Sequence, residues 1–348
     1  MDRHGPRFRR ARAILLAAAA LLACDAGTAR AVIIYGEPGR DTSAPGDAAL
    51  ATRWNQVGNW GGFLGTPIAS NFFLTAKHVG GAVGDSLTFL DGASHQTVAR
   101  FEDPGSDLAL WQVAVAFDSA RIVPLYTDAT VALSAPLAIF GRGTARGTAV
   151  FGDAFGGGSD QKGWQWGAGD GARSWGTNNL DGTHSAPGAG LQLVFSFSND
   201  QGGTEGTLSV GDSGGPVFIQ QAGVWSLAGI NYAVQGPFNT TDSGGGFFAA
   251  LYDVGGLYRT DGAGGWAYET PQGSAQPSYA FSTSTTARLA WIEGTVTAVP
   301  EPGGLALLAA AAACWPLCRG LLPPRAHATA GRLTSDGSRR TRPARRRG

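Results

Sequence analysis

A serine set between glycines, in the stretch Gly211-Asp212-Ser213-Gly214-Gly215-Pro216, is the first residue of this sequence that could do chemistry. A serine hydroxyl is a weak nucleophile at neutral pH, so it needs a base beside it and hydrogen-bond donors where an oxyanion would form. Flanking glycines let the chain turn tightly and direct two backbone N–H groups to one point. Pro216 ends the turn, because it has no N–H to donate to a sheet. The stretch therefore predicts a nucleophile loop around Ser213.

Two other segments contain a candidate base and a candidate partner for that base. An apolar run over residues 70–75 leads into Ala76-Lys77-His78, and Asp107 opens a run of alternating apolar residues over 108–115. An imidazole accepts and returns a proton near neutral pH, and a carboxylate beside it fixes its tautomer. The chain thus holds a candidate base, orienting acid and nucleophile in the order His78, Asp107, Ser213.

Two histidines and one aspartate compete for these roles. His95 and His184 lie in polar turns, where a histidine is more often structural than catalytic. Asp103 belongs to Asp103-Pro104-Gly105, which is typical of a turn, whereas Asp107 leads directly into a strand. His78 and Asp107 therefore remain the candidate base and the candidate orienting acid.

The three segments resemble the histidine, aspartate and serine motifs of the trypsin/chymotrypsin-like serine proteases, over roughly residues 53–258. Residues 211–216 match the serine motif at every position, whereas Lys77 stands where the family has a small residue. The resemblance implies an all-β fold of two six-stranded antiparallel β-barrels, with the active site in the cleft between them. It implies a serine endopeptidase that hydrolyses peptide bonds of a protein or peptide substrate through His78, Asp107 and Ser213, with an oxyanion hole at Gly211 and Ser213. No cofactor and no metal are expected.

The same resemblance makes predictions about specificity and activation. It places Thr207 at the base of a specificity pocket, and Tyr232 and Val234 in its wall, where the family has Ser-Trp-Gly over 232–234. Since none of the three is charged, we expect cleavage after small or apolar residues. It also implies that a new amino terminus at Val32 pairs with Asp212, although residues 32–36 are equally well read as a first strand.

Composition favours short strands over long helices. The 348 residues include 54 glycines and ten tryptophans, and apolar runs separated by turn residues recur at 72–74, 86–90, 108–115, 137–140, 191–197, 216–220 and 224–232. Such spacing is typical of β-sandwiches and β-barrels. The Gly/Trp-rich residues 155–188 are interpreted as an inserted surface loop that shapes substrate access or binds matrix glycans.

The amino-terminal residues 1–31 are typical of a secretory signal peptide. They combine a basic start, an apolar run over 13–23 and Ala29-Arg30-Ala31 before Val32, which predicts cleavage by a signal peptidase. The apolar run is too short for a comfortable membrane span. An alternative is a lipoprotein signal, because Leu21-Leu22-Ala23-Cys24 resembles a lipobox.

The carboxyl-terminal residues 299–319 resemble the PEP-CTERM sorting signal, on Val299-Pro300-Glu301-Pro302, a short apolar segment and Arg319. The resemblance implies an exosortase-type sorting enzyme as a partner, transient membrane association through the apolar segment, and export to the periplasm, cell envelope or extracellular matrix of a Gram-negative bacterium. Residues 320–348 depart from the family pattern as a basic tail, which we expect to be disordered.

The predicted protease domain, residues 32–298, holds 11 basic and 22 acidic residues, a formal charge of −11. Such a domain does not favour nucleic acid or an anionic membrane surface. It contains no cysteine, because the three in the chain are Cys24, Cys314 and Cys318, so its stability must come without disulfides. The alternatives to an enzyme are a catalytically inactive protease-like surface or matrix binding protein, with Lys77 or Tyr232 disturbing the triad, and a glycine- and tryptophan-rich matrix protein.

Overall fold

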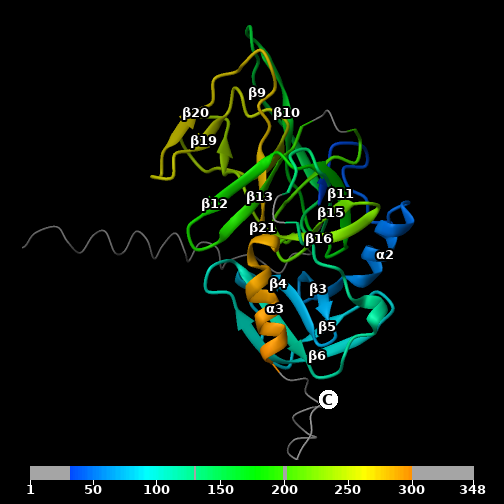
Figure 1. Cartoon of the computed structure of the whole chain (residues 1–348). Coiled ribbons are helices and arrows are strands. Elements are labelled where there is room, and N and C mark those ends of the chain that lie inside the picture. Colours follow the sequence, from blue (N-terminus) through cyan, green and yellow to red (C-terminus); the bar gives the residue numbers. More distant parts are fainter. Residues whose placement is uncertain (1–31, 129–130, 199–201, 300–348) are drawn as a thin grey trace, which may run out of the picture. The chain divides into compact units, whose positions relative to one another are not determined.

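Antiparallel β-strands make up most of the structure, a computed structural model that describes residues 32–128, 131–198 and 202–299 (Figure 1). The predicted signal peptide, the predicted sorting signal from Pro300 onward and the tail lie outside these residues, as do all three cysteines. Within them, no helix is both long and apolar enough to cross a membrane. The predicted all-β fold is confirmed.

Six strands close the predicted first barrel in the order β2-β3-β4-β7-β6-β5. Two neighbouring strands, β4 and β7, are buried along their whole length and pair from Phe72 opposite Gln112 to Ala76 opposite Leu108. The residues that follow β4 and precede β7 must therefore lie side by side. The barrel strands are β2 (Gly58–Trp60), β3 (Phe63–Ala69), β4 (Phe72–Ala76), β5 (Ser86–Thr88), β6 (Ser94–Glu102) and β7 (Leu108–Val113).

The second half of the fold is a seven-stranded antiparallel sheet in the order β11-β8-β15-β16-β21-β13-β12. Its seventh strand, β12, is added at the edge by a hairpin to β13. The sheet curls, since Asn178 Nδ2 of β11 donates to the carbonyl oxygen of Ser196 in β13, at 2.7 Å. The strands are β8 (Pro136–Gly141), β11 (Ser174–Asn179), β12 (Gly182–Ala186), β13 (Gly190–Ser196), β15 (Pro216–Gln221), β16 (Val224–Val234) and β21 (Tyr279–Ser284).

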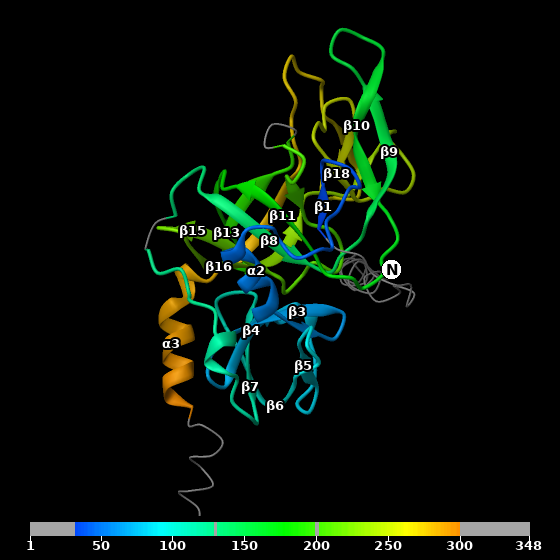
Figure 2. The same cartoon turned by 90° about the vertical axis from the view of Figure 1, so that its right-hand side faces the viewer.

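Among the described residues, three small sheets complete the strands, and two of them, one with the β9–β10 hairpin and one with β19 and β20, form an outer lobe (Figures 1 and 2). The strands are β1 (Ile33–Ile34) with β14 (Gly206–Thr207); β9 (Arg146–Asp153) and β10 (Ser159–Trp166) with β18 (Ala249–Leu251); and β17 (Phe238–Asn239), β19 (Tyr258–Thr260) and β20 (Trp266–Tyr268). The interpretation of residues 155–188 as an inserted loop was wrong, because they contain β10, β11 and β12. In β11, buried residues alternate with half-buried ones. Gly176 of this strand lies against the backbone of Gly206, where a side chain would leave little space.

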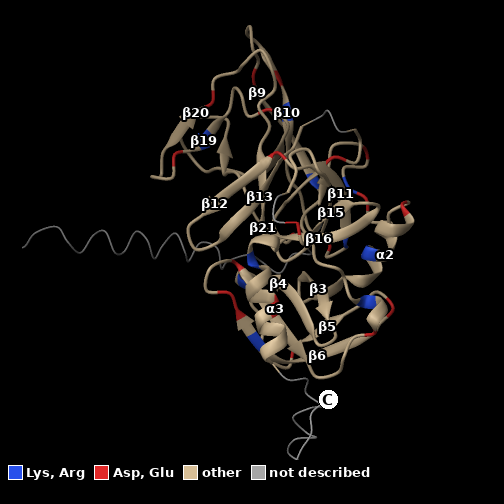
Figure 3. Ribbon diagram, in the orientation of Figure 1, with Lys and Arg blue, Asp and Glu red and all other residues tan. Residues whose placement is uncertain are grey.

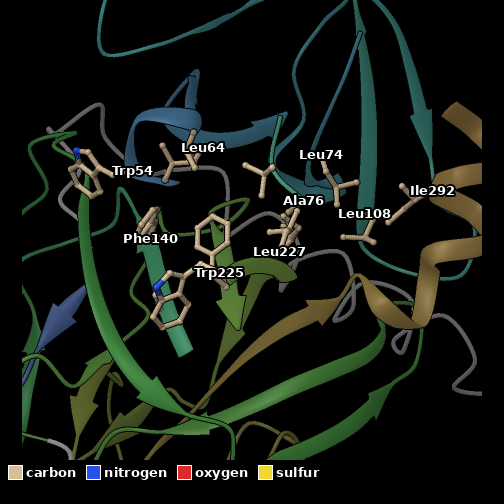
Figure 4. Close-up of a cluster of buried hydrophobic side chains, with 14 of the residues drawn as sticks. Trp54, Leu64, Leu74, Ala76, Leu108, Phe140, Trp225, Leu227 and Ile292 are labelled. Carbon is tan, nitrogen blue, oxygen red and sulfur yellow. The ribbon is translucent and has the colours of Figure 1, made fainter. Parts of the chain in front are cut away.

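One hydrophobic cluster joins the barrel to the seven-stranded sheet (Figure 4). Leu74 and Leu108 from the barrel, Phe140 and Leu227 from the sheet, and Ile292 from helix α3 all belong to it. Apolar burial of this kind is the main favourable term in folding. The cluster therefore holds together the two halves from which the candidate site is built.

Among the described residues, two α-helices and three short 3₁₀ helices lie beside the sheets. Helix α2 (Ala48–Gln56) begins at Asp47, whose carboxylate accepts the N–H of Leu50 at 2.7 Å, and it buries Trp54 against Phe140. Helix α3 (Leu289–Ala298) follows η3 (Thr286–Arg288) near the end of the described residues. The other short helices are η1 (Lys77–Val79), which contains His78, and η2 (Ser119–Arg121).

Candidate active site

The structure brings the side chains of His78, Asp107 and Ser213 together. His78 Nδ1 lies 2.6 Å from Asp107 Oδ2, and His78 Nε2 lies 2.8 Å from Ser213 Oγ. The backbone N–H of His78 also donates to Asp107 Oδ1 at 3.1 Å. Asp107 is buried, whereas the His78 side chain is 40 % exposed. A neutral imidazole that donates from Nδ1 to the carboxylate leaves Nε2 free to accept the serine proton.

The pairing of β4 with β7 explains the contact between His78 and Asp107. Ala76 and Leu108 are opposite each other at the ends of the two strands. Lys77 follows Ala76 and Asp107 precedes Leu108, and the N–H of Lys77 donates to the carbonyl oxygen of Asp107 at 2.8 Å. His78 then turns back over Asp107 in η1. The register between two buried strands thus fixes the base against its orienting acid.

The nucleophile loop lies between β14 and β15 and requires its glycines. Gly211 and Gly214 have φ values of 95° and 76°, in the region that favours glycine. A Cβ on Gly215 would overlap the carbonyl oxygen of Phe140, so the loop packs directly on β8. The loop is further fixed by Gly214 N–H, which donates to the carbonyl oxygen of Asn231 at 3.0 Å.

Two N–H groups in the nucleophile loop have no acceptor among the described residues. In the described part of the chain, the N–H groups of Gly211 and Ser213 donate no hydrogen bond, whereas those of Asp212, Gly214 and Gly215 are all bonded to carbonyl oxygens. Gly211 and Ser213 are also half-buried rather than fully buried. Two unpaired backbone donors that can point to one oxygen atom beside the serine hydroxyl are what an oxyanion hole requires.

Asp212, between those two donors, points its carboxylate into the interior. Gly143 N–H donates to Oδ1 at 2.7 Å, while the N–H and hydroxyl of Ser209 donate to Oδ2 at 2.7 and 3.0 Å. The backbone nitrogen of Val32 is a further donor. Burial raises the pKa of Asp212 to about 7, although these hydrogen bonds act in the opposite direction. Within the described residues no cation pairs with this carboxylate, so it lies in a site where a cation would be strongly favoured.

Lys77, the departure in the histidine motif, does not face Ser213. Its ammonium donates to the carbonyl oxygens of Asp103 and Ser106 at 2.9 and 2.6 Å. Asp103, the competing aspartate, is buried and pairs with Arg288 rather than with His78. The geometry therefore removes the sequence-based reason to expect Lys77 to disturb the His78–Ser213 contact.

The residues predicted to form a specificity pocket lie in three settings. Thr207 is almost fully buried in β14, where it pairs with Ile33. The Tyr232 ring stands edge-on to the imidazole of His78, with centroids 5.8 Å apart, and burial, with the charge of Asp107, raises its pKa. Val234 is half-buried against an apolar cluster that includes Val32. Tyr232 thus borders the imidazole itself, in edge-on contact with the His78 ring.

The other two histidines, His95 and His184, lie in strands β6 and β12 rather than in the predicted turns. The ring of His95 packs on Phe117 with centroids 4.6 Å apart, and its Nδ1 lies 2.9 Å from the carbonyl oxygen of Val115. His184 is exposed on β12. Across the described ranges, no group of three or more His, Cys, Asp or Glu side chains could hold a metal ion. On the coloured part of the ribbon in Figure 3, which covers the described residues, Lys and Arg are scattered rather than gathered into a stripe.

Sequence reasoning missed Asn231 and Arg288. Asn231 is fully buried, and its Nδ2 donates to the carbonyl oxygens of Phe140 and Asp212 at 2.9 and 3.1 Å, so it supports the nucleophile loop. A polar residue inside the apolar strand Val224–Val234 was the available indication. Arg288 gave no such indication, because its partner Asp103 is 185 residues away.

No protein-family model matches the chain, and no curated protein matches it. A similar solved structure is mouse neuropsin, described as a serine protease expressed in the limbic system of the brain. The two chains are 14 % identical, the match covers 67 % of this chain and 88 % of that chain, and the TM-score is 0.40. At these values the similarity carries no argument about activity.

Proposed function

We propose that this chain is a serine endopeptidase that hydrolyses peptide bonds through His78, Asp107 and Ser213. The observation that carries the proposal is the pair of contacts on one imidazole, 2.6 Å from Nδ1 to Asp107 and 2.8 Å from Nε2 to Ser213. An oriented base in contact with a serine hydroxyl, beside unpaired backbone donors, is the arrangement that nucleophilic acyl transfer needs.

The mechanism assigns one task to each group. His78 takes the proton of Ser213 as the hydroxyl attacks the peptide carbonyl, and Asp107 keeps Nδ1 protonated and stabilises the imidazolium. The N–H groups of Gly211 and Ser213 donate to the developing oxyanion. His78 then gives its proton to the leaving amine, and water repeats the cycle on the acyl-enzyme.

The proposal includes activation by a free amino group on Val32. The Val32 nitrogen already donates to the Asp212 carboxylate, and both residues are buried. Cleavage after Ala31 would turn that amide into an ammonium and give the carboxylate its missing cation. The segment is held there by β1–β14 pairing and by Arg146, which donates to the carbonyl oxygen of Tyr35 at 2.8 Å. Export and processing would then produce the active site in one step.

Three finer predictions belong to the same proposal. Thr207, Tyr232 and Val234 offer no charge to a substrate side chain, so cleavage after small or apolar residues is expected. Export through residues 1–31, by way of a signal peptidase, and sorting through residues 299–319, by an exosortase-type enzyme, would place the domain in the periplasm, cell envelope or extracellular matrix.

Digestion of an unfolded protein substrate tests this function. The chain with Val32 as its first residue, and the same chain with Ser213→Ala, are incubated with reduced, alkylated substrate, and new termini are mapped by mass spectrometry. We expect internal cleavages after small or apolar residues that are absent with Ser213→Ala. A folded chain that makes no internal cut, or equal cutting by both chains, would contradict the proposal.

A further inference from the structure

Lys77 ties the segment that carries His78 to the turn that carries Asp107. Its ammonium donates to the carbonyl oxygens of Asp103 at 2.9 Å and Ser106 at 2.6 Å, near the two ends of that turn. Its backbone N–H donates to the carbonyl oxygen of Asp107. Lys77, the first residue of η1 and the residue directly before the proposed base, therefore holds the turn that leads to Asp107.

The same turn is held from the other end of the chain by Arg288. The Asp103 carboxylate is fully buried and accepts both Nε and a terminal nitrogen of Arg288, each at 2.5 Å. It also accepts the hydroxyl of Ser106 at 2.5 Å and the N–H of Gly105 at 3.0 Å. Burial raises the pKa of Asp103, but the hydrogen bonds from Arg288 and Ser106 outweigh it and hold that pKa below its ordinary value. A bidentate pair of this kind fixes orientation as well as distance.

Arg288 is itself fixed in place. It ends η3 and directly precedes α3, whose Ile292 lies in the same apolar cluster as Leu108, the first residue of β7 (Figure 4). The apolar cluster that includes Ile292 of α3 is thus connected through Arg288 and Asp103 to the turn that precedes Asp107. No cysteine is present between residues 32 and 299 to supply a covalent restraint.

We propose that Lys77 and Arg288 are positioning residues, which hold the turn from Asp103 to Asp107 so that Asp107 keeps both hydrogen bonds to His78. The predicted loss of kcat rests on the proposed function. The predicted weakening of the His78–Asp107 contact does not depend on that function. Misplacement of a catalytic group by about 1 Å can cost about 100-fold in rate. Loss of either residue should therefore lower kcat and leave KM nearly unchanged.

Glutamine variants with a matched control test the proposal. Lys77→Gln and Arg288→Gln are compared with Lys162→Gln in the full chain. Lys162 is a 1 % exposed lysine that pairs with Asp160 and Asp253 in the outer lobe, so its loss weakens the fold without touching His78. Two readouts are used: kcat and KM on a peptide substrate, and the proton resonance of His78 Nδ1–H, which a short bond to a carboxylate shifts far downfield and protects from exchange.

We expect Lys77→Gln and Arg288→Gln to lower kcat about 10- to 100-fold and to speed exchange of the Nδ1 proton. Lys77→Arg, which keeps donors for the two carbonyl oxygens, should recover part of both losses. Lys162→Gln should lower the unfolding temperature yet leave both readouts as in the parent chain. Arg288→Lys, which keeps the charge and loses the bidentate geometry, gives a milder variant if Arg288→Gln does not fold.

Three outcomes would overturn the proposal. The first is exchange of the Nδ1 proton at the parent rate in Lys77→Gln and in Arg288→Gln, or in Arg288→Lys if Arg288→Gln does not fold. The second is an equal loss of kcat and of exchange protection in Lys162→Gln. The third is a rise in KM with unchanged kcat in the Lys77 and Arg288 variants. If the parent chain hydrolyses nothing, the proposed function fails. The exchange of the Nδ1 proton still decides whether Lys77 and Arg288 position Asp107.

Discussion

A free amino group on Val32 should stabilise the fold most strongly above neutral pH. The comparison is between a chain that begins at Val32 and one with a single alanine before it. In the longer chain the donor to Asp212 is a neutral amide, and burial raises the pKa of this carboxylate to about 7. The usual value for an aspartate is about 3.9, so the folded chain binds this proton more tightly than the unfolded chain.

The sign and size of the effect follow from that difference. The stability contributed by protonated Asp212 is complete below about pH 4 and is lost as the pH rises through about 7. At about 1.4 kcal/mol for each pKa unit, the longer chain loses up to about 4 kcal/mol of its free energy of unfolding. In the chain that begins at Val32, the ammonium pairs with the ionised carboxylate and offsets the loss. The free energies of unfolding of the two chains should therefore diverge as the pH rises.

Urea unfolding at pH 5 and at pH 7.5 measures this divergence. We expect a small difference between the chains at pH 5 and a difference of about 2–4 kcal/mol at pH 7.5. In an Asp212→Asn background, which has no carboxylate to ionise at this position, the longer chain should no longer lose stability between pH 5 and pH 7.5. Parallel stability curves for the two chains would refute the reasoning.

Three substitutions test other parts of the site. Asp107→Asn should lower kcat about 10⁴-fold with an unchanged unfolding temperature, because the amide cannot hold Nδ1 protonated; steady-state kinetics will show it. Gly215→Ala should destabilise by about 1–3 kcal/mol, measured by urea unfolding, because its methyl group would overlap the Phe140 carbonyl oxygen. Asn231→Leu should lower the unfolding temperature and slow acylation, since it removes the two hydrogen bonds from Asn231 Nδ2 to the carbonyl oxygens of Phe140 and Asp212; calorimetry and stopped-flow kinetics measure the two effects. Wild-type behaviour in any of the three would contradict the stated contact.

The proposed catalytic residues could be predicted because each stands in a short local motif at a strand end. His78 follows the buried strand β4, and Asp107 precedes the buried strand β7. Apolar runs of this length locate strands even without knowledge of their partners. The strand pairing that brings them together follows from the structure alone, since it depends on register between segments about thirty residues apart.

The features that sequence reasoning missed depend on contacts between distant segments. The side chain of Lys77 could be placed beside the serine or away from it, and only the carbonyl oxygens of Asp103 and Ser106 decide its direction. The pair of Asp103 and Arg288 joins residues 185 apart. Residues 155–188 were misread for a different reason: glycines at close backbone approaches, such as Gly176, interrupt the usual β-strand composition.

Labelling with a fluorophosphonate tests the central claim most directly, because such a probe reacts with a serine only where a base and an oxyanion hole are assembled. The chain that begins at Val32 is treated beside its Ser213→Ala and His78→Ala variants, and the modified peptide is identified by mass spectrometry. We predict one label, on Ser213, that is absent from Ser213→Ala and nearly absent from His78→Ala. A folded chain with a free Val32 amino group that takes no label, or takes it on another residue, would contradict the account.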